Sequence, residues 1–273
     1  GYERFAAALV ANRVPSAVLG PLGSAARLLP RTGGYHELRR SVERFAADPH
    51  SSPELRYRSW VSVFDETALR RVLAPDLRAL VDRTEPYASF DRALGEAGSG
   101  PLLHRLLHVN FRTYLHDDLL VKTDRMSMAN SLEARSPFLD TELAGYLASL
   151  PPEMKATPFA LKRLLRRSLE GVLPREILRR RKHGFGVPVG RWFRSELRRP
   201  FEELVLGGGA RSAEVLDPRG VRTLFDEHLR GTDHGGRLWL LLSLELWLRK
   251  LEGPQQTEPP SEPNILVSET RSE

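Results

Sequence analysis

The sequence contains no cysteine, which excludes a disulfide framework, a thiolate metal site and a cysteine nucleophile. This composition fits a cytoplasmic protein. No apolar run is long enough to span a bilayer, so we expect no membrane partner. The first residues do not form a secretory signal, and an initiator Met is absent, so we expect the chain to begin within a longer protein.

Strand signals are nearly absent, so the pattern predicts a mainly α fold. The 273 residues are 41% hydrophobic and 28% charged, which is typical of a folded globular protein. From Gly253 onward, prolines stand among Ser, Glu and Gln with little apolar content. We therefore expect one folded region over residues 1–252 and a disordered tail over residues 253–273.

Apolar residues recur at helical spacing along most of residues 1–252. Asp65 and Asp140 are placed as N-caps, Pro174 opens a helix, and Gly171 is placed as a helix stop. Trp239 and Trp247 lie on one face of the last helix and are expected in the core. The predicted helices cover residues 3–14, 25–29, 35–47, 53–64, 66–72, 75–81, 88–98, 101–114, 141–149, 159–171, 175–180, 188–206, 221–229 and 236–251.

The segment from Leu119 to Asp140 mixes charges of both signs into a run that otherwise resembles a buried helix. Buried charge is costly unless it is paired or meets a ligand. Two interpretations follow: an ion-pair network that holds helices together, or the lining of a polar cavity. Asp124 next to Arg125, and Glu133 two residues before Arg135, could pair with each other in either case.

A second unusual segment is Arg181-Lys182-His183-Gly184-Phe185-Gly186, where cations stand beside glycines. Glycine lets backbone N–H groups approach an anion closely, and lysine is a compact positive charge for phosphate. The net charge of +6 suits such a partner. An exposed basic loop without function explains the same residues equally well.

Other motifs point to no chemistry. His104 and His108 have zinc-compatible spacing, but no third ligand lies at a diagnostic distance, so we assign no metal ligand. Gly207-Gly208-Gly209 lacks the Gly-Lys-Ser/Thr ending of a phosphate loop and is interpreted as a connector. No Gly-x-Ser-x-Gly nucleophile elbow is present.

The run from Tyr114 to Asp140 is followed, in order, by LPPEMK, LKRLLRR, LPREILRRRKHGFGVPVGRWFRSEL and LWLLLSLELWLRKL. This series resembles the C-terminal part of glutamine-hydrolysing asparagine synthetases. The resemblance implies a two-domain parent ligase, in which an N-terminal glutaminase domain releases ammonia from glutamine. A synthetase domain then adenylates the side-chain carboxylate of aspartate with ATP and Mg²⁺, and ammonia displaces AMP.

The chain departs from that pattern in lacking the Ser-Gly-Gly-x-Asp-Ser loop, the GxDE motif and any cysteine. The expected fold is therefore the helical distal half of an α/β adenine-nucleotide α-hydrolase-like (PP-loop) synthetase domain. The glutaminase domain and the PP-loop half are absent, and the fragment alone should not make asparagine. Mg²⁺ would be held mainly by the absent half.

By resemblance, Lys182 matches the family's catalytic lysine in an RxK-x-x-F loop. Asp124, Arg125, Glu133, Arg135 and Gly184 are assigned to substrate or nucleotide binding, although Glu133 and Arg135 could equally brace a helix. The expected partners are ATP, aspartate, glutamine-derived ammonia, the absent glutaminase and PP-loop portions, and a second copy in a homodimeric parent. Two alternatives stay open: a related amidotransferase acting on another carboxylate in β-lactam formation or peptide cyclisation, and a non-catalytic basic helical module that binds nucleic acid.

Overall fold

The computed structural model describes residues 3–26, 28, 42, 45–46, 50–81, 83–180 and 187–252. These residues are mostly helical, and the only β-type pairings among them are isolated bridges. The expectation of a mainly α chain is thus confirmed for the described residues. The chain divides into two compact units, Gly1–Pro188 and Val189–Glu273. No helix among the described residues is long and apolar enough to cross a membrane.

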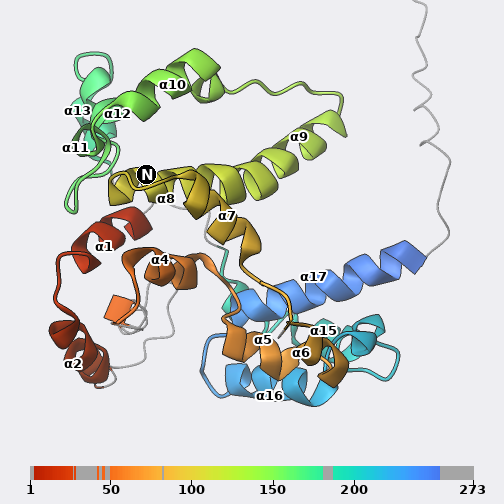
Figure 1. Cartoon of the computed structure of the whole chain (residues 1–273). Coiled ribbons are helices and arrows are strands. Elements are labelled where there is room, and N and C mark those ends of the chain that lie inside the picture. Colours follow the sequence, from red (N-terminus) through yellow and green to blue (C-terminus); the bar gives the residue numbers. More distant parts are fainter. Residues whose placement is uncertain are drawn as a thin grey trace, which may run out of the picture. The chain divides into compact units, whose positions relative to one another are not determined.

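The core of the first unit lies where four helices meet (Figure 1). They are α1 (Glu3–Ala11), α4 (Pro53–Val61), α7 (Ala88–Glu96) and α8 (Leu102–Asn110). Each contributes apolar residues spaced three or four apart, so that one stripe of each helix is buried. The core residues are Phe5, Ala8, Ala11, Tyr57, Trp60, Phe90, Ala93, Leu103, Leu106 and Val109. Three further helices of this unit are α2 (Ser16–Ala26), α5 (Glu66–Val72) and α6 (Pro75–Val81).

Side-chain caps fix where α4 and α5 begin. The Ser52 hydroxyl accepts a hydrogen bond from the Leu55 N–H, and the Asp65 carboxylate accepts one from the Ala68 N–H at 2.8 Å. Each cap satisfies a donor that the first helical turn cannot pair internally. The sequence prediction for Asp65 is confirmed.

The helix that starts at Leu102 continues without a break through Met128. α8 passes into a π-helical stretch, η1 (Phe111–Leu120), and then into α9 (Val121–Met128), as Figure 1 shows. The flanking residues Asn110 and Val121 keep right-handed helical φ and ψ. The prediction that this helix ends at residue 114 is therefore wrong, because nothing in the backbone interrupts the helix there.

Residues 129–180 form short elements: η2 (Pro137–Leu139), α10 (Thr141–Ser149), α11 (Pro152–Lys155), α12 (Arg163–Ser168) and α13 (Arg175–Arg179). Asp140 caps α10 through the Leu143 N–H, and Pro174 precedes α13, as predicted. Gly171 has the left-handed φ of +84° that glycine tolerates, but α12 already ends at Ser168 with Leu169 as its C-cap, so the prediction of a helix stop at Gly171 is wrong.

The helix predicted over residues 159–171 is much shorter than expected. Thr157 and Ala160 pair in an antiparallel bridge, and Lys162 has a left-handed φ of 54°, so α12 cannot start before Arg163. The predicted faces of this segment are largely preserved. Its leucines are half-buried, whereas its lysine and arginines are exposed.

The second unit contains α14 (Val189–Trp192), α15 (Arg198–Leu204), η3 (Arg211–Glu214), α16 (Pro218–Leu229) and α17 (Gly235–Glu252). The helix predicted over residues 188–206 is split, because turns occupy residues 193–197. Phe201 stacks on Phe225 with ring centroids 4.9 Å apart, and its ring meets Phe193 edge-on at 5.5 Å. All three rings are fully buried and form the centre of this unit's core.

Trp239 and Trp247 do not lie in that core. Their exposed fractions are 45% and 56%, so the prediction that both are core residues is wrong. The buried face of α17 is formed instead by Leu238, Leu241 and Leu242. Helical spacing placed the two tryptophans correctly on one face, but that face is not covered by the described residues.

A wholly buried carboxylate ties the glycine connector to α17. Glu245 accepts hydrogen bonds from the backbone N–H groups of Arg211 (3.1 Å) and Ser212 (2.7 Å), and from the Arg249 guanidinium. Arg249 also donates to the carbonyls of Leu204 and Gly209. Burial alone would raise the pKa of Glu245, but these hydrogen bonds outweigh it and hold the pKa below its ordinary value. This arrangement supports the interpretation of residues 207–209 as a connector.

Replacing Glu245 with glutamine should lower the free energy of unfolding by about 1–3 kcal/mol, because an amide presents N–H groups where the backbone already donates. Denaturant titration of the purified chain measures the loss. Glu203→Gln is the matched control, since Glu203 also pairs with an arginine four residues away but is exposed. Equal effects of the two substitutions would contradict the structural role assigned to Glu245.

Candidate functional site

The four described residues assigned to the site lie on α9 and on the segment that follows it. Asp124 and Arg125 belong to α9, and Glu133 and Arg135 lie in the segment before η2. All four are exposed, and no residue from Leu119 to Asp140 is buried. The expectation of buried charge is therefore wrong for this chain: the described residues enclose these charges neither in a core nor in a cavity.

The turn at the end of α9 sets the direction of the segment that carries Glu133 and Arg135. Ser131 adopts a left-handed φ of 54°, and the Leu132 N–H donates to the Ser127 carbonyl at 3.0 Å. The Asn130 amide donates to the Met126 carbonyl at 2.9 Å. These bonds satisfy carbonyls of the last turn and turn the chain away from the helix axis.

Glu133 and Arg135 pair with each other, as expected. The Arg135 Nε lies 2.8 Å from the Glu133 Oε1, and the side chains are 85% and 66% exposed for Arg135 and Glu133, respectively. Within the described residues no ion pair joins Asp124 to Arg125, which point in different directions because successive helical residues are rotated by about 100°. An exposed pair of this kind contributes about 0–1 kcal/mol, so Arg135 can change partners at little cost.

Lys182 and Gly184 lie outside the described residues, because residues 181–186 are not among them. The distance from Lys182 to Asp124, Arg125, Glu133 or Arg135 therefore remains a prediction. On either side of that segment the structure describes α13, which ends at Arg179, and α14, which begins at Val189.

His104 and Lys155 form a contact that sequence reasoning missed. The His104 Nε2 accepts a hydrogen bond from the Lys155 ammonium at 2.9 Å, and the same ammonium donates to the Ala148 carbonyl. Burial lowers the pKa of both groups, and the lysine charge lowers that of His104 further. Lys155 of the LPPEMK motif thus fixes α11 to α8, and His104 offers no lone pair to a metal.

A hollow of about 210 Å³ lies beside α7 and η1. Two ion pairs lie in its lining: Arg112 lies 3.1 Å from Glu96, and His116 lies 2.6 Å from Asp117. No described residue of the predicted site lines it, and no group of three His, Cys, Asp or Glu among the described residues could hold a metal. The hollow therefore carries no functional assignment.

Comparison with known proteins identifies the family. The asparagine synthase family matches residues 1–249. A putative asparagine synthetase [glutamine-hydrolyzing] of Mycobacterium bovis is 36% identical over 195 residues, which is 71% of this chain and 29% of the relative. Asparagine synthetase [glutamine-hydrolyzing] 1 of Bacillus subtilis is 29% identical over 196 residues, or 70% of this chain and 30% of the relative.

The match to a mammalian relative is shorter. The asparagine synthetase [glutamine-hydrolyzing] of Bos taurus is 29% identical over 163 residues, covering 54% of this chain and 28% of the relative. No solved structure matches the chain. The alignments thus span about three tenths of the length of these relatives. On the match to residues 1–249, the chain belongs to the asparagine synthase family.

Proposed function

We propose that this chain supplies the helical distal half of an ATP-dependent, amide-forming synthetase domain. In the proposed reaction, an aspartate side-chain carboxylate attacks the α-phosphorus of ATP and releases pyrophosphate. Ammonia derived from glutamine then attacks the acyl-adenylate and displaces AMP, which gives asparagine. The observation that carries this proposal is the family match over residues 1–249.

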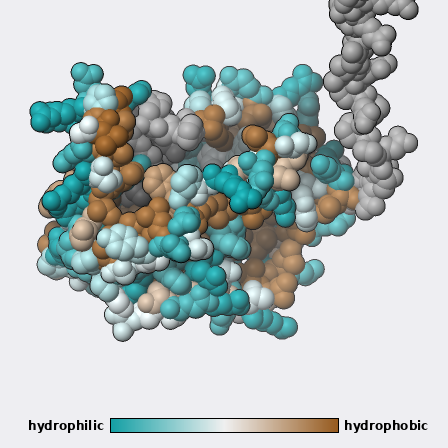
Figure 2. Space-filling model, turned by 90° about the horizontal axis from the view of Figure 1, so that it is seen from above, coloured by the Kyte–Doolittle hydropathy of each residue, from teal (hydrophilic) through white to brown (hydrophobic). Residues whose placement is uncertain are grey.

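The proposal assigns the PP-loop half and the glutaminase domain to sequence outside this chain. Exposed apolar residues support a further covering part, because a large apolar surface on a folded protein marks an interaction site. Hydrophobic residues reach the surface in several places on the face shown in Figure 2. The exposed hydrophobic residues on α9, the following segment and α10 include Met126, Met128, Leu132, Phe138 and Tyr146.

In the proposed mechanism Lys182 stabilises the charge that develops on the α-phosphate and the departing pyrophosphate. A fixed cation stabilises that transition state more than the ground state. Gly184 would let the backbone approach the phosphates. Arg125 and Arg135 are exposed guanidiniums that can each hold a carboxylate or phosphate in a two-point contact, and Arg135 loses little by leaving Glu133.

Bound Mg²⁺ would neutralise charge on the pyrophosphate oxygens. The described residues do not form a site for it: Asp124 and Glu133 are exposed, and no cluster of three ligating side chains is present among them. We therefore assign no magnesium ligand to the described residues, and the proposed ligands lie on the PP-loop half.

The test is ATP–pyrophosphate exchange by the gene product that includes this chain together with any coding sequence that precedes it. Exchange that requires aspartate is expected, and this chain alone is expected to show none. The same exchange assay with other carboxylates in place of aspartate distinguishes asparagine synthesis from the β-lactam-forming and peptide-cyclising alternatives. Absence of exchange with every carboxylate, together with salt-dependent binding of generic oligonucleotides, would replace the ligase by a nucleic-acid-binding module.

A further inference from the structure

One long face of α17 is apolar and exposed, and we call it the tryptophan face. Its hydrophobic side chains, which are between 45% and 59% exposed, are Trp239, Leu240, Leu246, Trp247 and Leu251. The opposite face of the helix is buried in the second unit through Leu238, Leu241 and Leu242. A surface helix with one buried face normally presents polar residues on the other. The tryptophan face is therefore a candidate interaction surface.

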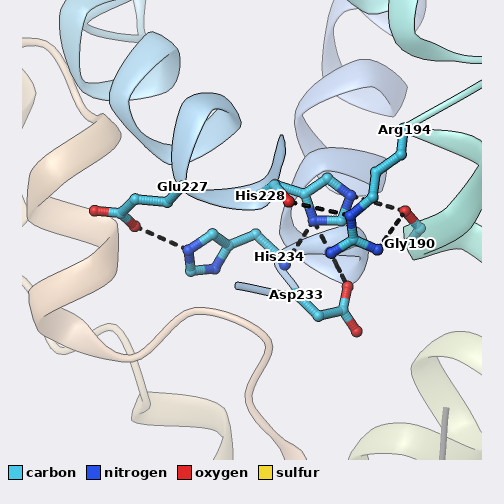
Figure 3. A network of polar contacts seen from close by, with 7 residues as sticks. Gly190, Arg194, Glu227, His228, Asp233 and His234 are labelled. Atoms are coloured by element: carbon cyan, nitrogen blue, oxygen red, sulfur yellow. Dashed lines mark hydrogen bonds and ion pairs between the residues drawn. The ribbon is translucent and has the colours of Figure 1, made fainter. Parts of the chain in front are cut away.

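α17 is held firmly where it begins. His228, wholly buried in the last turn of α16, accepts a hydrogen bond at Nδ1 from the His234 N–H at 3.0 Å, and its Nε2 lies 2.8 Å from the Gly190 carbonyl. Figure 3 shows the imidazole and the Arg194 guanidinium both directed toward Gly190. A Cβ on Gly235 would lie 2.7 Å from the N and Cα of Gly190, so the two backbones are in close contact. The tryptophan face thus needs little ordering before it binds.

The apolar pattern of the tryptophan face is symmetric about Ser243. The nine residues centred on Ser243 are WLLLSLELW. Trp239 and Trp247 lie four residues on either side of the serine, and Leu240 and Leu246 lie three residues on either side. Because successive helical residues turn by about 100°, all five point within about 60° of one direction. An isologous contact needs this symmetry, since residue i meets j where j meets i.

Ser243 can lie at the centre of a contact without cost to its hydroxyl. The Ser243 Oγ donates to the Trp239 carbonyl at 2.8 Å. Because the hydroxyl is satisfied within its own helix, covering it leaves no donor unpaired. A small side chain at the crossing point also allows two helix axes to approach to about 8–10 Å.

The charge on the tryptophan face favours an antiparallel pair. Lys250 is the one charged residue of α17 that points within about 60° of Ser243. In a parallel pair the two Lys250 ammonium groups would face each other. In an antiparallel pair that crosses at Ser243 they lie about 21 Å apart along the helices, because each is seven residues from the centre. Each lysine then lies level with Gly236 of the second copy, which has no side chain, and the helix dipoles oppose each other favourably.

We propose that the tryptophan face binds a second copy of this chain, through an antiparallel pair of α17 helices that cross at Ser243. This inference goes beyond the proposed function and does not depend on it. Trp239 of one copy then lies level with Trp247 of the second, and Leu240 lies level with Leu246. Tryptophan is the residue type most typical of the few that dominate binding energy in an interface.

The exposed area sets the strength of the dimer. A tryptophan buries about 150–250 Å², so the two half-exposed tryptophans offer about 200 Å². With the leucines, the two copies together bury about 900 Å², which is the size of a weak, reversible interface and not of an obligate one. We expect a Kd of about 10–100 µM for so small a contact. Well below that concentration the chain is monomeric, and Trp247 keeps its exposure.

Sedimentation velocity of the chain, residues 1–273, over about 1–500 µM tests the proposal, since this range brackets the expected Kd. A reversible monomer–dimer equilibrium is expected. Trp239→Ala and Trp247→Ala should each raise the Kd at least about 10-fold. Phe159→Ala is the control, because it removes a ring that is 94% exposed in the other unit, and it should leave the Kd unchanged. Far-UV circular dichroism verifies that each variant is folded.

A cysteine at the proposed two-fold axis tests the register. The chain contains no cysteine, so Ser243→Cys provides its only thiol. Two thiols that face each other across the axis are within reach of a disulfide, and oxidised glutathione should convert the variant into a covalent dimer. Ser195→Cys, at an exposed serine of the same unit outside α17, is the matched control and should crosslink far more slowly.

A chain that stays monomeric at 500 µM would overturn the proposal. So would a dimer that survives both tryptophan substitutions, or crosslinking of Ser243→Cys no faster than that of Ser195→Cys. If Trp247→Ala does not fold, Leu240→Glu places a charge level with Leu246 and is judged by the same change in Kd. Dimerisation of this chain but not of the full gene product would assign the tryptophan face to sequence outside the chain, against the proposal. Because no measurement here involves pyrophosphate exchange, failure of the proposed function leaves these outcomes unchanged.

Discussion

Replacing Lys182 with alanine is expected to lower aspartate-dependent ATP–pyrophosphate exchange by about 10²–10³-fold, the cost typical of removing one preorganised transition-state donor. The KM for ATP should change far less. The ammonium opposes charge that grows as the pyrophosphate departs, and the ground state carries less of that charge on the reacting oxygens. Steady-state exchange at varied ATP concentration, with aspartate saturating, measures both constants in the full gene product.

Two variants make that result specific to Lys182. Lys122→Ala removes an exposed lysine whose only ion-pair partner among the described residues is Asp118, four residues earlier in the same helix, so exchange should be unaffected. Lys182→Arg keeps the charge but replaces a compact ammonium by a planar fork, so only partial recovery is expected. Full activity in Lys182→Ala would remove the lysine from the mechanism, and an equal loss in Lys122→Ala would point to a general effect of net charge.

Local signals in the sequence predicted much of the helical structure. The Asp65 and Asp140 caps and the helix start after Pro174 lie where expected, because each depends on a few neighbouring residues. The same local rules failed where tertiary structure decides. Lys162 takes a left-handed conformation inside a helical pattern, and no propensity separates the π-helical residues 111–120 from ordinary helix.

Burial was the less predictable property. The pattern at residues 119–140 and the spacing of Trp239 and Trp247 indicate which residues share a face, but not what covers that face. In the described residues, no residue from 119 to 140 is buried, and Trp239 and Trp247 are exposed. The argument that buried charge at residues 119–140 indicates a binding site therefore started from a wrong premise. The assignments of Asp124, Arg125, Glu133 and Arg135 therefore depend on the family resemblance alone.

The sequence analysis did not single out His228, a fully buried histidine in the last turn of α16, for a different reason. A single histidine within an amphipathic helix has no sequence signature that separates a buried connector from an exposed side chain. Its role becomes visible only when Gly190, 38 residues earlier, and His234 are brought to its two ring nitrogens. Long-range pairing of this kind cannot be read from local spacing.

Phe201→Ala should cost about 3–5 kcal/mol of unfolding free energy, the usual range for deleting a large buried ring. Phe201 is fully buried between Phe193 and Phe225, and loses contacts with both rings. Trp247→Ala, although it removes a larger side chain from the same unit, should cost less, about 1–2 kcal/mol, because Trp247 is 56% exposed. Urea titrations followed by circular dichroism compare the two variants with the parent chain.

The contrast tests burial directly, because both residues are aromatic and lie in the same unit. A packing pattern read from spacing alone predicts that the tryptophan is the costlier loss. The structure predicts the reverse, since the contribution of a side chain depends on the area that folding removes from water, not on its size. A larger loss for Trp247→Ala than for Phe201→Ala would mean that the exposed face of α17 is covered in solution. If that loss of free energy depends on protein concentration, a second copy of the chain covers the face; if it does not, contacts within one chain cover it.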